Sequence, residues 1–243
     1  MNNHAQIMGI SFPKMTMDQS LHLLEDVVGQ NRKELFYVVT GNPEIVMSCQ
    51  HDRKLRSIVE EAGLVTADGI GIVMVSRLRG GHLPERVTGC DLLIQLLEKG
   101  NRHSWSFYLL GADEPTSRRA AEVIGERYPG VRVAGRHHGY FHKDDEAAIV
   151  EDIRAAAPDF LIVALGAPYA ENWIHNYKAH LGAKVAIGVG GSLDIVAGKV
   201  KRAPAVWQKL HAEWLYRLIR QPSRWRRQLL LPRFALRALL YKD

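Results

Sequence analysis

The clearest sign of the fold is the run Phe160-Leu161-Ile162-Val163-Ala164-Leu165, which gives way at once to Gly166-Ala167-Pro168. A continuous apolar run of this length predicts a strand buried on both faces, and the glycine and proline predict a turn ahead of the next helix. The order of strand, glycine-bearing turn and helix recurs at least four times along the 243 residues. This alternation is typical of an α/β fold of Rossmann-like type, with a mostly parallel sheet covered by helices on both faces.

The remaining elements follow from the periodicity of apolar side chains. We expect strands at residues 6–12 (an edge strand), 35–39, 106–110, 131–135, 160–165 and 185–189, and a further strand end just before Thr66. We expect helices at residues 16–29, 45–50, 54–61, 70–79, 92–99, 116–128 and 144–156, and from about residue 170 onward. Thr16 has the properties of a helix cap, and Pro43 suits the first turn of a helix.

The loops after the strands form one candidate site, because ligands of open α/β sheets bind at the carboxyl ends of the strands. These loops are expected at residues 40–44, 66–71, 111–116, 166–171 and 190–194. The second of them, Thr66-Ala67-Asp68-Gly69-Ile70-Gly71, places one carboxylate between two apolar runs. Taken alone, Asp68 is best explained as the cap of the helix that begins near Ile70. Its place among five strand-end loops makes it a candidate general base, with Thr40, Asn42 and Arg86 able to orient a sugar and its phosphate.

Several other site classes are not indicated. Gly111-Ala112-Asp113 and Gly188-Val189-Gly190-Gly191-Ser192 can surround a phosphate with backbone N–H groups, but the chain contains neither G-x-G-x-x-G nor a P-loop. It has no D-x-D motif for a metal-bound diphosphate, and the histidine-rich run at 136–142 lacks a clear metal-ligand pattern. No serine or cysteine has the neighbours of an activated nucleophile. A dehydrogenase, a P-loop nucleotide triphosphatase and a zinc site are therefore not expected.

Length and composition indicate a globular protein with a substantial core, since 47% of the residues are hydrophobic and 24% are charged. We expect an α/β catalytic domain at residues 1–198 and a helical appendage at residues 199–243. Cys49 and Cys90 lie in apolar patterns typical of reduced thiols. The first residues lack the features of a signal peptide, and no apolar run reaches the ~18 residues of a membrane span. These observations predict a cytoplasmic protein.

The positive charge is concentrated at the end of the chain. The formal net charge is +6, but from Lys199 onward there are 12 lysines and arginines and only two acidic residues. The rest of the chain holds 20 basic and 24 acidic residues, so a mildly acidic body carries a strongly basic tail. Such a tail predicts a polyanionic partner.

Three interpretations of the basic tail remain open. Apolar side chains recur at helical spacing through residues 203–220 and 222–240, with arginines between them and three of the five tryptophans. Basic helices with tryptophan and leucine faces suit an anionic membrane surface. The alternative is a pair of helices packed on the core with a solvated basic face. Nucleic acid is ranked lowest, because no nucleic-acid-binding motif surrounds the basic residues.

The chain resembles the WecG/TagA/CpsF glycosyltransferase family over nearly its whole length. The first matching stretches are Thr40-Gly41-Asn42-Pro43-Glu44, Ala67-Asp68-Gly69-Ile70-Gly71, Arg86-Val87-Thr88-Gly89 with Asp91, and Leu165-Gly166-Ala167-Pro168 with Glu171 and Trp173. The most specific is Gly188-Val189-Gly190-Gly191-Ser192, followed by Asp194, Gly198, Arg202-Ala203-Pro204, Glu213-Trp214, Tyr216-Arg217-Leu218 and Pro222.

The resemblance implies an inverting transfer of N-acetylmannosamine, or a related sugar, from a UDP donor without a metal or other cofactor. The implied acceptor is N-acetylglucosamine on undecaprenyl diphosphate, in the synthesis of teichoic acid or a related cell-wall glycan. The tail would then place the enzyme on the inner face of the plasma membrane and close over the site. By the same resemblance Asp68 is the base, and Thr40, Asn42 and Arg86 match positions implicated in substrate binding and catalysis. We assign UDP binding to Gly111, Gly166, Gly190, Gly191 and Asp194, and the acceptor diphosphate to Arg217, Arg224 and Arg227.

Two questions stay open at this point. The family usually has Gln before the Glu of its Gly-x-Pro-x-Gln-Glu motif, and Ala170 stands in that place here, so a side-chain hydrogen bond near the sugars is missing. One alternative therefore keeps the fold but transfers glucose or N-acetylmannosaminuronic acid in exopolysaccharide synthesis. Another is a non-catalytic protein whose tail binds nucleic acid or lipid. The oligomeric state is also open, and a homo-oligomer is compatible with the sequence.

Overall fold

The computed structural model describes residues 3–30, 32, 34–204, 207, 213–220 and 230–241 of the chain. Its centre is a six-stranded sheet in which all neighbouring strands are parallel, as predicted. In spatial order the strands are β4 (Leu64–Ala67), β3 (Phe36–Gly41), β8 (Val185–Gly188), β7 (Phe160–Ala164), β5 (Ser106–Gly111) and β6 (Arg132–His137). The last strand of the chain, β8, therefore lies in the middle of the sheet, between β3 and β7.

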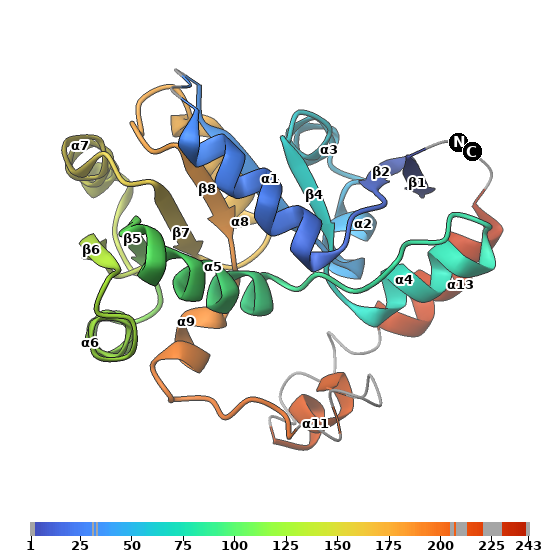
Figure 1. Cartoon of the computed structure of the whole chain (residues 1–243). Helices are drawn as coiled ribbons and strands as arrows, with labels where there is room; N and C mark the ends of the chain where they lie inside the picture. Colours follow the sequence, from blue (N-terminus) through green and yellow to red (C-terminus); the bar gives the residue numbers. More distant parts are fainter. Residues whose placement is uncertain are drawn as a thin grey trace.

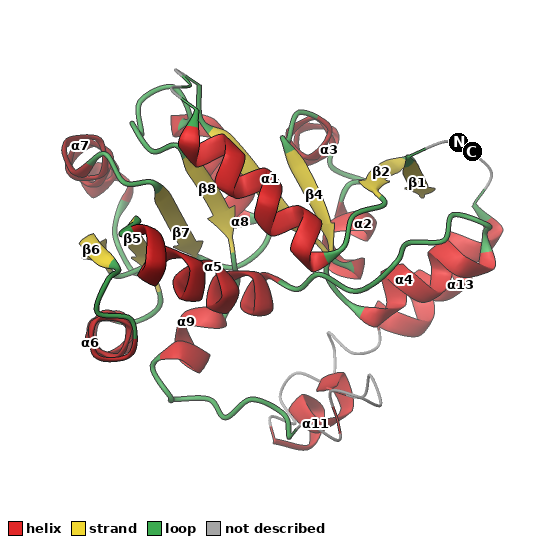
Figure 2. Ribbon diagram, viewed as in Figure 1, coloured by secondary structure: helices red, strands yellow, loops and turns green. Residues whose placement is uncertain are grey.

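Helices cover both faces of this sheet, as the continuous apolar strands require (Figures 1 and 2). One face packs against α1 (Met17–Gly29), α5 (Gly89–His103), α6 (Glu114–Arg127) and α9 (Ser192–Val196). The other packs against α2 (Pro43–Ser48), α3 (Arg53–Glu60), α8 (Tyr169–Tyr177) and α7 (Glu146–Ala156), which the short helix η1 (Lys143–Asp145) precedes. Side chains of β7 alternate between these two cores, with Phe160 and Ile162 in the first and Leu161 and Val163 in the second.

One helix start is as predicted, and two helices start earlier than expected. The Thr16 side chain accepts a hydrogen bond from Gln19 N–H and caps α1. Pro43 lies in the first turn of α2, as predicted, but that helix begins at Pro43 rather than at residue 45, because the Asn42 side chain caps it there. The helix expected at residues 92–99 begins at Gly89 instead, because the Thr88 hydroxyl accepts a hydrogen bond from Asp91 N–H and caps it. This cap brings the start of α5 to the carboxyl edge of the sheet.

The prediction of a single edge strand at residues 6–12 is wrong. The segment forms a separate antiparallel hairpin of β1 (His4–Ile7) and β2 (Ile10–Pro13). Met8 and Gly9 connect the two strands with φ angles of 52° and 76°. Two positive φ angles in a two-residue connection are what a tight hairpin turn needs, and they reverse the chain before it can join the large sheet.

The end of the chain returns to the body through α13 (Leu230–Leu240), while α11 (Glu213–Arg220) precedes it. α13 packs on α4 (Ile70–Leu78) and α2 and buries Phe234 and Ala238. At the far end of α13, Arg79 Nη1 donates to the carbonyl oxygens of Ala238 and Tyr241, both at 2.6 Å. None of the helices among the described residues is long and apolar enough to cross a membrane. The predicted division into an α/β domain at residues 1–198 and an appendage at residues 199–243 stays a prediction.

Candidate active site

A cavity of about 380 Å³ lies at the carboxyl edge of β3, β4 and β8. Four of the five predicted loops line it, those at 40–44, 66–71, 166–171 and 190–194, and the loop at 111–116 does not. The β3 and β8 loops are neighbours because the strand order reverses there, which is where ligands of such sheets bind. A larger hollow of about 800 Å³ lies between the β1–β2 hairpin and the start of β4. It holds none of the predicted site residues, so we assign the site to the smaller cavity.

Asp68 stands at the end of β4 and lines the cavity. Its N–H donates to the carbonyl oxygen of Gly41 (2.9 Å), which ties the loop to the end of β3. Its Oδ2 accepts a hydrogen bond from Gly89 N–H (3.1 Å), at the start of α5. The alternative that Asp68 caps α4 is therefore wrong, because the residue at that cap is Gly69, with a φ of 113° and no side chain. The hydrogen bond from α5 holds the carboxylate at the cavity wall.

Thr40 and Asn42 lie on the next strand end, beside Asp68. The buried Thr40 hydroxyl donates to the carbonyl oxygen of Gly188 (2.9 Å) and so joins the ends of β3 and β8. The Asn42 side-chain oxygen Oδ1 accepts a hydrogen bond from Ile45 N–H (3.0 Å). Both side chains are thus oriented by the backbone around the cavity before any ligand binds.

Two arginines that line the cavity converge on one carboxylate beside it. Asp91, in the first turn of α5, accepts a hydrogen bond from Arg202, and Arg86 Nη2 lies 3.9 Å from its Oδ2. Asp91 is in turn held by the Thr88 hydroxyl, which donates to it at 2.7 Å. Arg86 was predicted from the sequence, whereas Arg202 belonged to a matched motif without an assigned role. The arrangement fixes two positive side chains at the wall of the cavity.

Glu171, like Asp68 and Glu44, is an acidic residue that lines the cavity, and it was not among the predicted site residues. It lies in the first turn of α8 and is 5% exposed, and its Oε2 has no hydrogen-bond partner among the described residues. Burial raises the pKa of Glu171 to about 7; a hydrogen bond from its own backbone N–H opposes the rise, and Glu44 adds to it. The matched motif contained Glu171, but the sequence did not show which face of the helix it occupies, so its place in the cavity could not be predicted.

The predicted glycines fall into two groups. Gly166, Gly190 and Gly191 line the cavity, and a Cβ on Gly166 or Gly190 would meet no atom within 4 Å. Gly111 lies outside the cavity, where a Cβ would come within 2.4 Å of the carbonyl oxygen of Ala164. Asp194 lies close to Gly191 and 3.7 Å from Lys199. The role of all five residues in UDP binding stays a prediction.

The three arginines assigned to the acceptor diphosphate cannot be placed. Arg217 belongs to α11, but its side chain lies outside the described part of the structure. Arg224 and Arg227 lie wholly outside the described residues. Their role stays a prediction.

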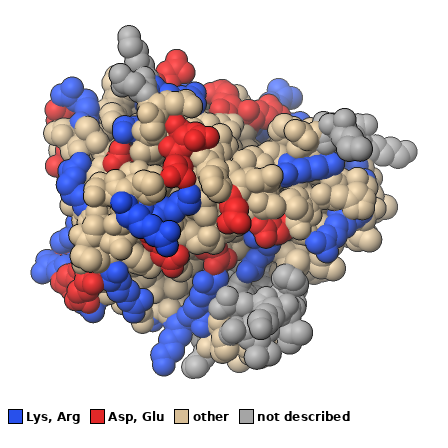
Figure 3. Space-filling view, viewed as in Figure 1, with Lys and Arg blue, Asp and Glu red and all other residues tan. Residues whose placement is uncertain are grey.

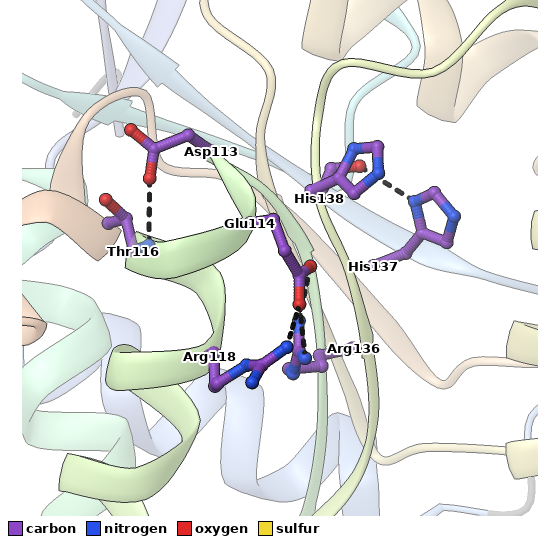
Figure 4. A network of polar contacts seen from close by, with 7 residues as sticks. All are labelled: Asp113, Glu114, Thr116, Arg118, Arg136, His137 and His138. Carbon is purple, nitrogen blue, oxygen red and sulfur yellow. Dashed lines mark hydrogen bonds and ion pairs between the residues drawn. The ribbon is translucent and has the colours of Figure 1, made fainter.

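At the β5–β6 end of the same sheet edge, charged side chains form a closed network (Figure 4). Glu114 accepts hydrogen bonds from both terminal nitrogens of Arg136, Nη2 at 2.7 Å and Nη1 at 2.8 Å, and a third from Arg118 at 3.0 Å. His137 Nδ1 lies 2.8 Å from the carbonyl oxygen of His138. Among the described residues, no group of three or more His, Cys, Asp or Glu side chains is arranged to hold a metal ion.

Comparison with known proteins gives a consistent result. Residues 5–243 match the Glycosyl transferase WecG/TagA/CpsF family. A protein of Bacillus spizizenii is 36% identical over 221 residues, covering 91% of this chain and 84% of that protein, and one of Bacillus subtilis is 38% identical over 202 residues, covering 83% and 78%. A Staphylococcus aureus protein is 33% identical over 213 residues, covering 88% and 83%.

All three relatives are named N-acetylglucosaminyldiphosphoundecaprenol N-acetyl-beta-D-mannosaminyltransferase. The chain belongs to the WecG/TagA/CpsF family and is a glycosyltransferase.

Proposed function

We propose, from this family membership, that the chain transfers N-acetylmannosamine from a UDP donor to N-acetylglucosamine linked to undecaprenyl diphosphate. The observation that supports the proposal best is the activity named for relatives that share up to 38% of the aligned residues. The product would serve a cell-wall polymer such as teichoic acid. The non-catalytic alternative loses its basis, because the family is one of glycosyl transferases.

Asp68 is proposed as the general base of an inverting reaction. It takes the proton of the acceptor hydroxyl, the hydroxyl oxygen attacks the anomeric carbon, and the bond from that carbon to the UDP oxygen breaks on the opposite side. One carboxylate suffices for this step, since UDP leaves as an anion and needs no proton. The hydrogen bond from Gly89 N–H supports this role, because it holds the carboxylate at the wall of the cavity.

Arg86 and Arg202 are proposed to hold the diphosphate of the donor. Negative charge develops on this group as the sugar leaves, and fixed cations stabilise it more effectively than water does. Asp91 holds both guanidinium groups at the cavity wall, so little reorganisation is needed when the donor binds. This arrangement supports a reaction that does not depend on a metal ion.

Association with the inner face of the membrane is proposed from the surface of α4 and α13. Large apolar side chains are exposed on both helices, namely Met74, Leu78, Leu236, Leu239 and Leu240. Lys and Arg side chains also show at the right of Figure 3, where Figure 1 places these helices. Exposed leucines next to basic side chains suit an anionic lipid surface. Since Leu230 and Leu231 at the start of α13 line the cavity, a membrane contact at α13 would bring the lipid-linked acceptor close to Asp68.

A donor panel tests the proposal. The full chain is incubated with a synthetic polyprenyl diphosphate that carries N-acetylglucosamine and with the UDP derivatives of N-acetylmannosamine, N-acetylglucosamine, glucose and N-acetylmannosaminuronic acid. We expect transfer of N-acetylmannosamine alone, unchanged by EDTA, and a product of inverted configuration by NMR. Transfer of glucose or of the uronic acid would instead favour the exopolysaccharide alternative, and loss of activity in EDTA would contradict metal independence.

A further inference from the structure

The base and the diphosphate cations leave Glu171 without a role, although its carboxyl group lies in the same cavity. A Cβ placed on Gly188 would lie 3.2 Å from Glu171 Oε1, so the head of the side chain rests against the end of β8. Gly188 is also the residue whose carbonyl oxygen accepts the hydrogen bond of the Thr40 hydroxyl. Glu171 therefore belongs to the floor of the cavity, directly beside the predicted substrate-binding residue.

Glu171 and Asp68 stand on opposite sides of the end of β3. Asp68 follows β4 and Glu171 contacts β8, and these two strands flank β3 in the sheet. Strands that are two apart in a sheet lie about 10 Å from each other, which leaves room for one sugar ring between the two carboxyl groups. A sugar whose anomeric carbon faces the base would thus turn its other side toward Glu171.

A helix-capping role does not explain Glu171. A glutamate at the third position of a helix normally reaches back to the N–H of the capping residue. The capping residue of α8 is Pro168, which has no N–H to donate. Glu171 is also 5% exposed, whereas a capping carboxylate gains most when it stays hydrated and ionised.

The neutral form of the side chain fits this surrounding. An ionised carboxylate without a full set of partners is costly to bury, while a neutral carboxyl group carries an O–H that needs only one acceptor. Among the described residues no partner completes Oε2, so a ligand in the cavity can supply the acceptor. Supplying it removes the penalty of an unsatisfied buried donor, and that gain is available only to a ligand with an oxygen at this place.

We propose that Glu171 binds as a neutral carboxylic acid and donates a hydrogen bond to an oxygen atom of the transferred sugar, which it thereby helps to select and orient. This inference rests on the proposed function, since it requires a nucleotide-sugar donor in the cavity. It makes donor binding depend on the protonation of one side chain.

The other groups around Glu171 do not mimic this dependence near neutral pH. On α2 the neighbours are Glu44 and Cys49, and burial raises the pKa of the Cys49 thiol to about 11, so it stays neutral. One turn along α8, burial and Lys178 lower the pKa of His175, which favours its neutral form. Asp68, Arg86 and Arg202 are the other charged side chains of the described residues that line the cavity. Replacing Glu171 alone separates its contribution from theirs.

The test is calorimetric titration of the full chain with UDP-N-acetylmannosamine between pH 6 and pH 8, in pairs of buffers that differ in ionisation enthalpy. At pH 7 we expect binding to take up about half a proton, since about half of the carboxyl groups are then ionised. Affinity should fall about tenfold from pH 6 to pH 8, in proportion to the protonated fraction. The methyl ester of UDP, which lacks the sugar and a titrating phosphate, should show neither effect.

Variants complete the test. Glu171→Gln keeps a donor without a titrating proton, so it should bind at pH 6 like the wild type and show no loss at pH 8. Glu171→Ala should bind the UDP-sugar about fivefold more weakly at pH 6 and the methyl ester equally well. Glu146→Gln is the matched control, because Glu146 is a buried acid of α7 that accepts hydrogen bonds from Tyr169 and Tyr177 outside the cavity. It should keep the pH dependence of the wild type.

Two outcomes would overturn the inference in distinguishable ways. A wild-type protein that binds the UDP-sugar with equal affinity at pH 6 and pH 8, or a Glu171→Gln variant with the wild-type pH dependence, refutes the role of Glu171 and leaves the transferase function intact. A wild-type protein that binds no UDP-sugar at any pH refutes the proposed function and the inference together.

Discussion

Along the carboxyl edge of one sheet, the β5–β6 end and the β3–β4–β8 end carry similar charged side chains in different surroundings. At the first end Glu114 is matched by Arg136 and Arg118, and Asp113 by Lys199, at the surface of the protein. At the second end the carboxyl groups of Asp68 and Glu171 and the guanidinium groups of Arg86 and Arg202 line a cavity.

The difference shows that the protein accepts the cost of burying a poorly paired carboxyl group in the cavity but not at the surface end of the sheet. Ion pairs lower the pKa of Asp113 and Glu114 to about 2, whereas burial raises that of Glu171 to about 7. Structural ion pairs stabilise the charged form of both partners, while a site that must bind a ligand keeps polar groups ready at some cost in stability. Five predictions can break or sharpen this contrast.

The largest effect is expected for Asp68→Asn. The variant keeps the size of the side chain but cannot take a proton, so turnover should fall about 10²- to 10⁴-fold. Binding of the UDP-sugar should stay nearly unchanged, as calorimetry can show. Asp113→Asn is the matched control, since Asp113 follows β5 as Asp68 follows β4 and asparagine caps α6 equally well. Comparable losses in the two variants would remove the distinction between the two ends.

Glycine substitutions should separate packing from ligand contact. Gly111→Ala should lower the free energy of unfolding by about 3 kcal/mol or more, because φ is 133° and the new Cβ would meet the Ala164 backbone. Gly190→Ala should lower it by only about 1 kcal/mol, since φ is 53° and the space is open. Its main effect should be weaker UDP-sugar binding. Chemical denaturation of both variants checks the first part; equal stability would show that Gly111 is not needed for packing.

Glu171 should make stability depend on pH. Its pKa is raised in the folded state, so the folded protein holds more protons than the unfolded chain between pH 4.5 and about 7, and stability falls as pH rises through that range. Relative to the wild type, Glu171→Gln should therefore gain about 2.5 kcal/mol in unfolding free energy between pH 5 and pH 8. Denaturation curves at both pH values measure this gain. A constant difference would mean that Glu171 is ionised throughout.

The ion pairs at the β5–β6 end should make stability depend on pH in the opposite direction. Because Arg136 and Arg118 lower the pKa of Glu114 and Lys199 lowers that of Asp113, the stabilisation by these pairs is present at neutral pH. It is lost as pH falls from about 4 toward 2, when the carboxylates take up protons.

The smallest effect is expected for the arginines. Arg202→Ala should weaken UDP-sugar binding about tenfold, the usual loss for one charge-assisted hydrogen bond. Arg136→Ala removes an arginine from the paired network, and its effect on binding should stay within about twofold. If Arg136→Ala weakened binding as much as Arg202→Ala, the ligand would have to reach the β5–β6 end.

Much of this arrangement could be predicted from the sequence, for identifiable reasons. Strands such as Phe160–Ala164 are continuous apolar runs, and the start of α1 has a cap, Thr16, that acts over three residues. The position of Asp68 after a strand followed from the same local pattern. These features depend on neighbours in the chain, so a single sequence contains the information.

Features that depend on spatial order could not be predicted. The choice of four loops out of five follows from β8 lying beside β3, which no local pattern reveals. Arg202 and Glu171 both belonged to the matched motifs without an assigned role, and only the structure places Arg202 on Asp91 and Glu171 in the cavity. The hairpin at residues 4–13 was missed because positive φ at Met8 is unusual for a residue with a side chain.

The central position of β8 in the sheet has a consequence for folding during synthesis on the ribosome. The strands β3 and β4 are synthesised first, and β5, β6 and β7 follow, but these two groups are not neighbours in the finished sheet. They become one sheet only when residues 185–188 emerge and insert between β3 and β7. A nascent chain stopped before that point would hold two half-sheets with unpaired edges, and the same insertion that removes these edges creates the floor of the candidate active site.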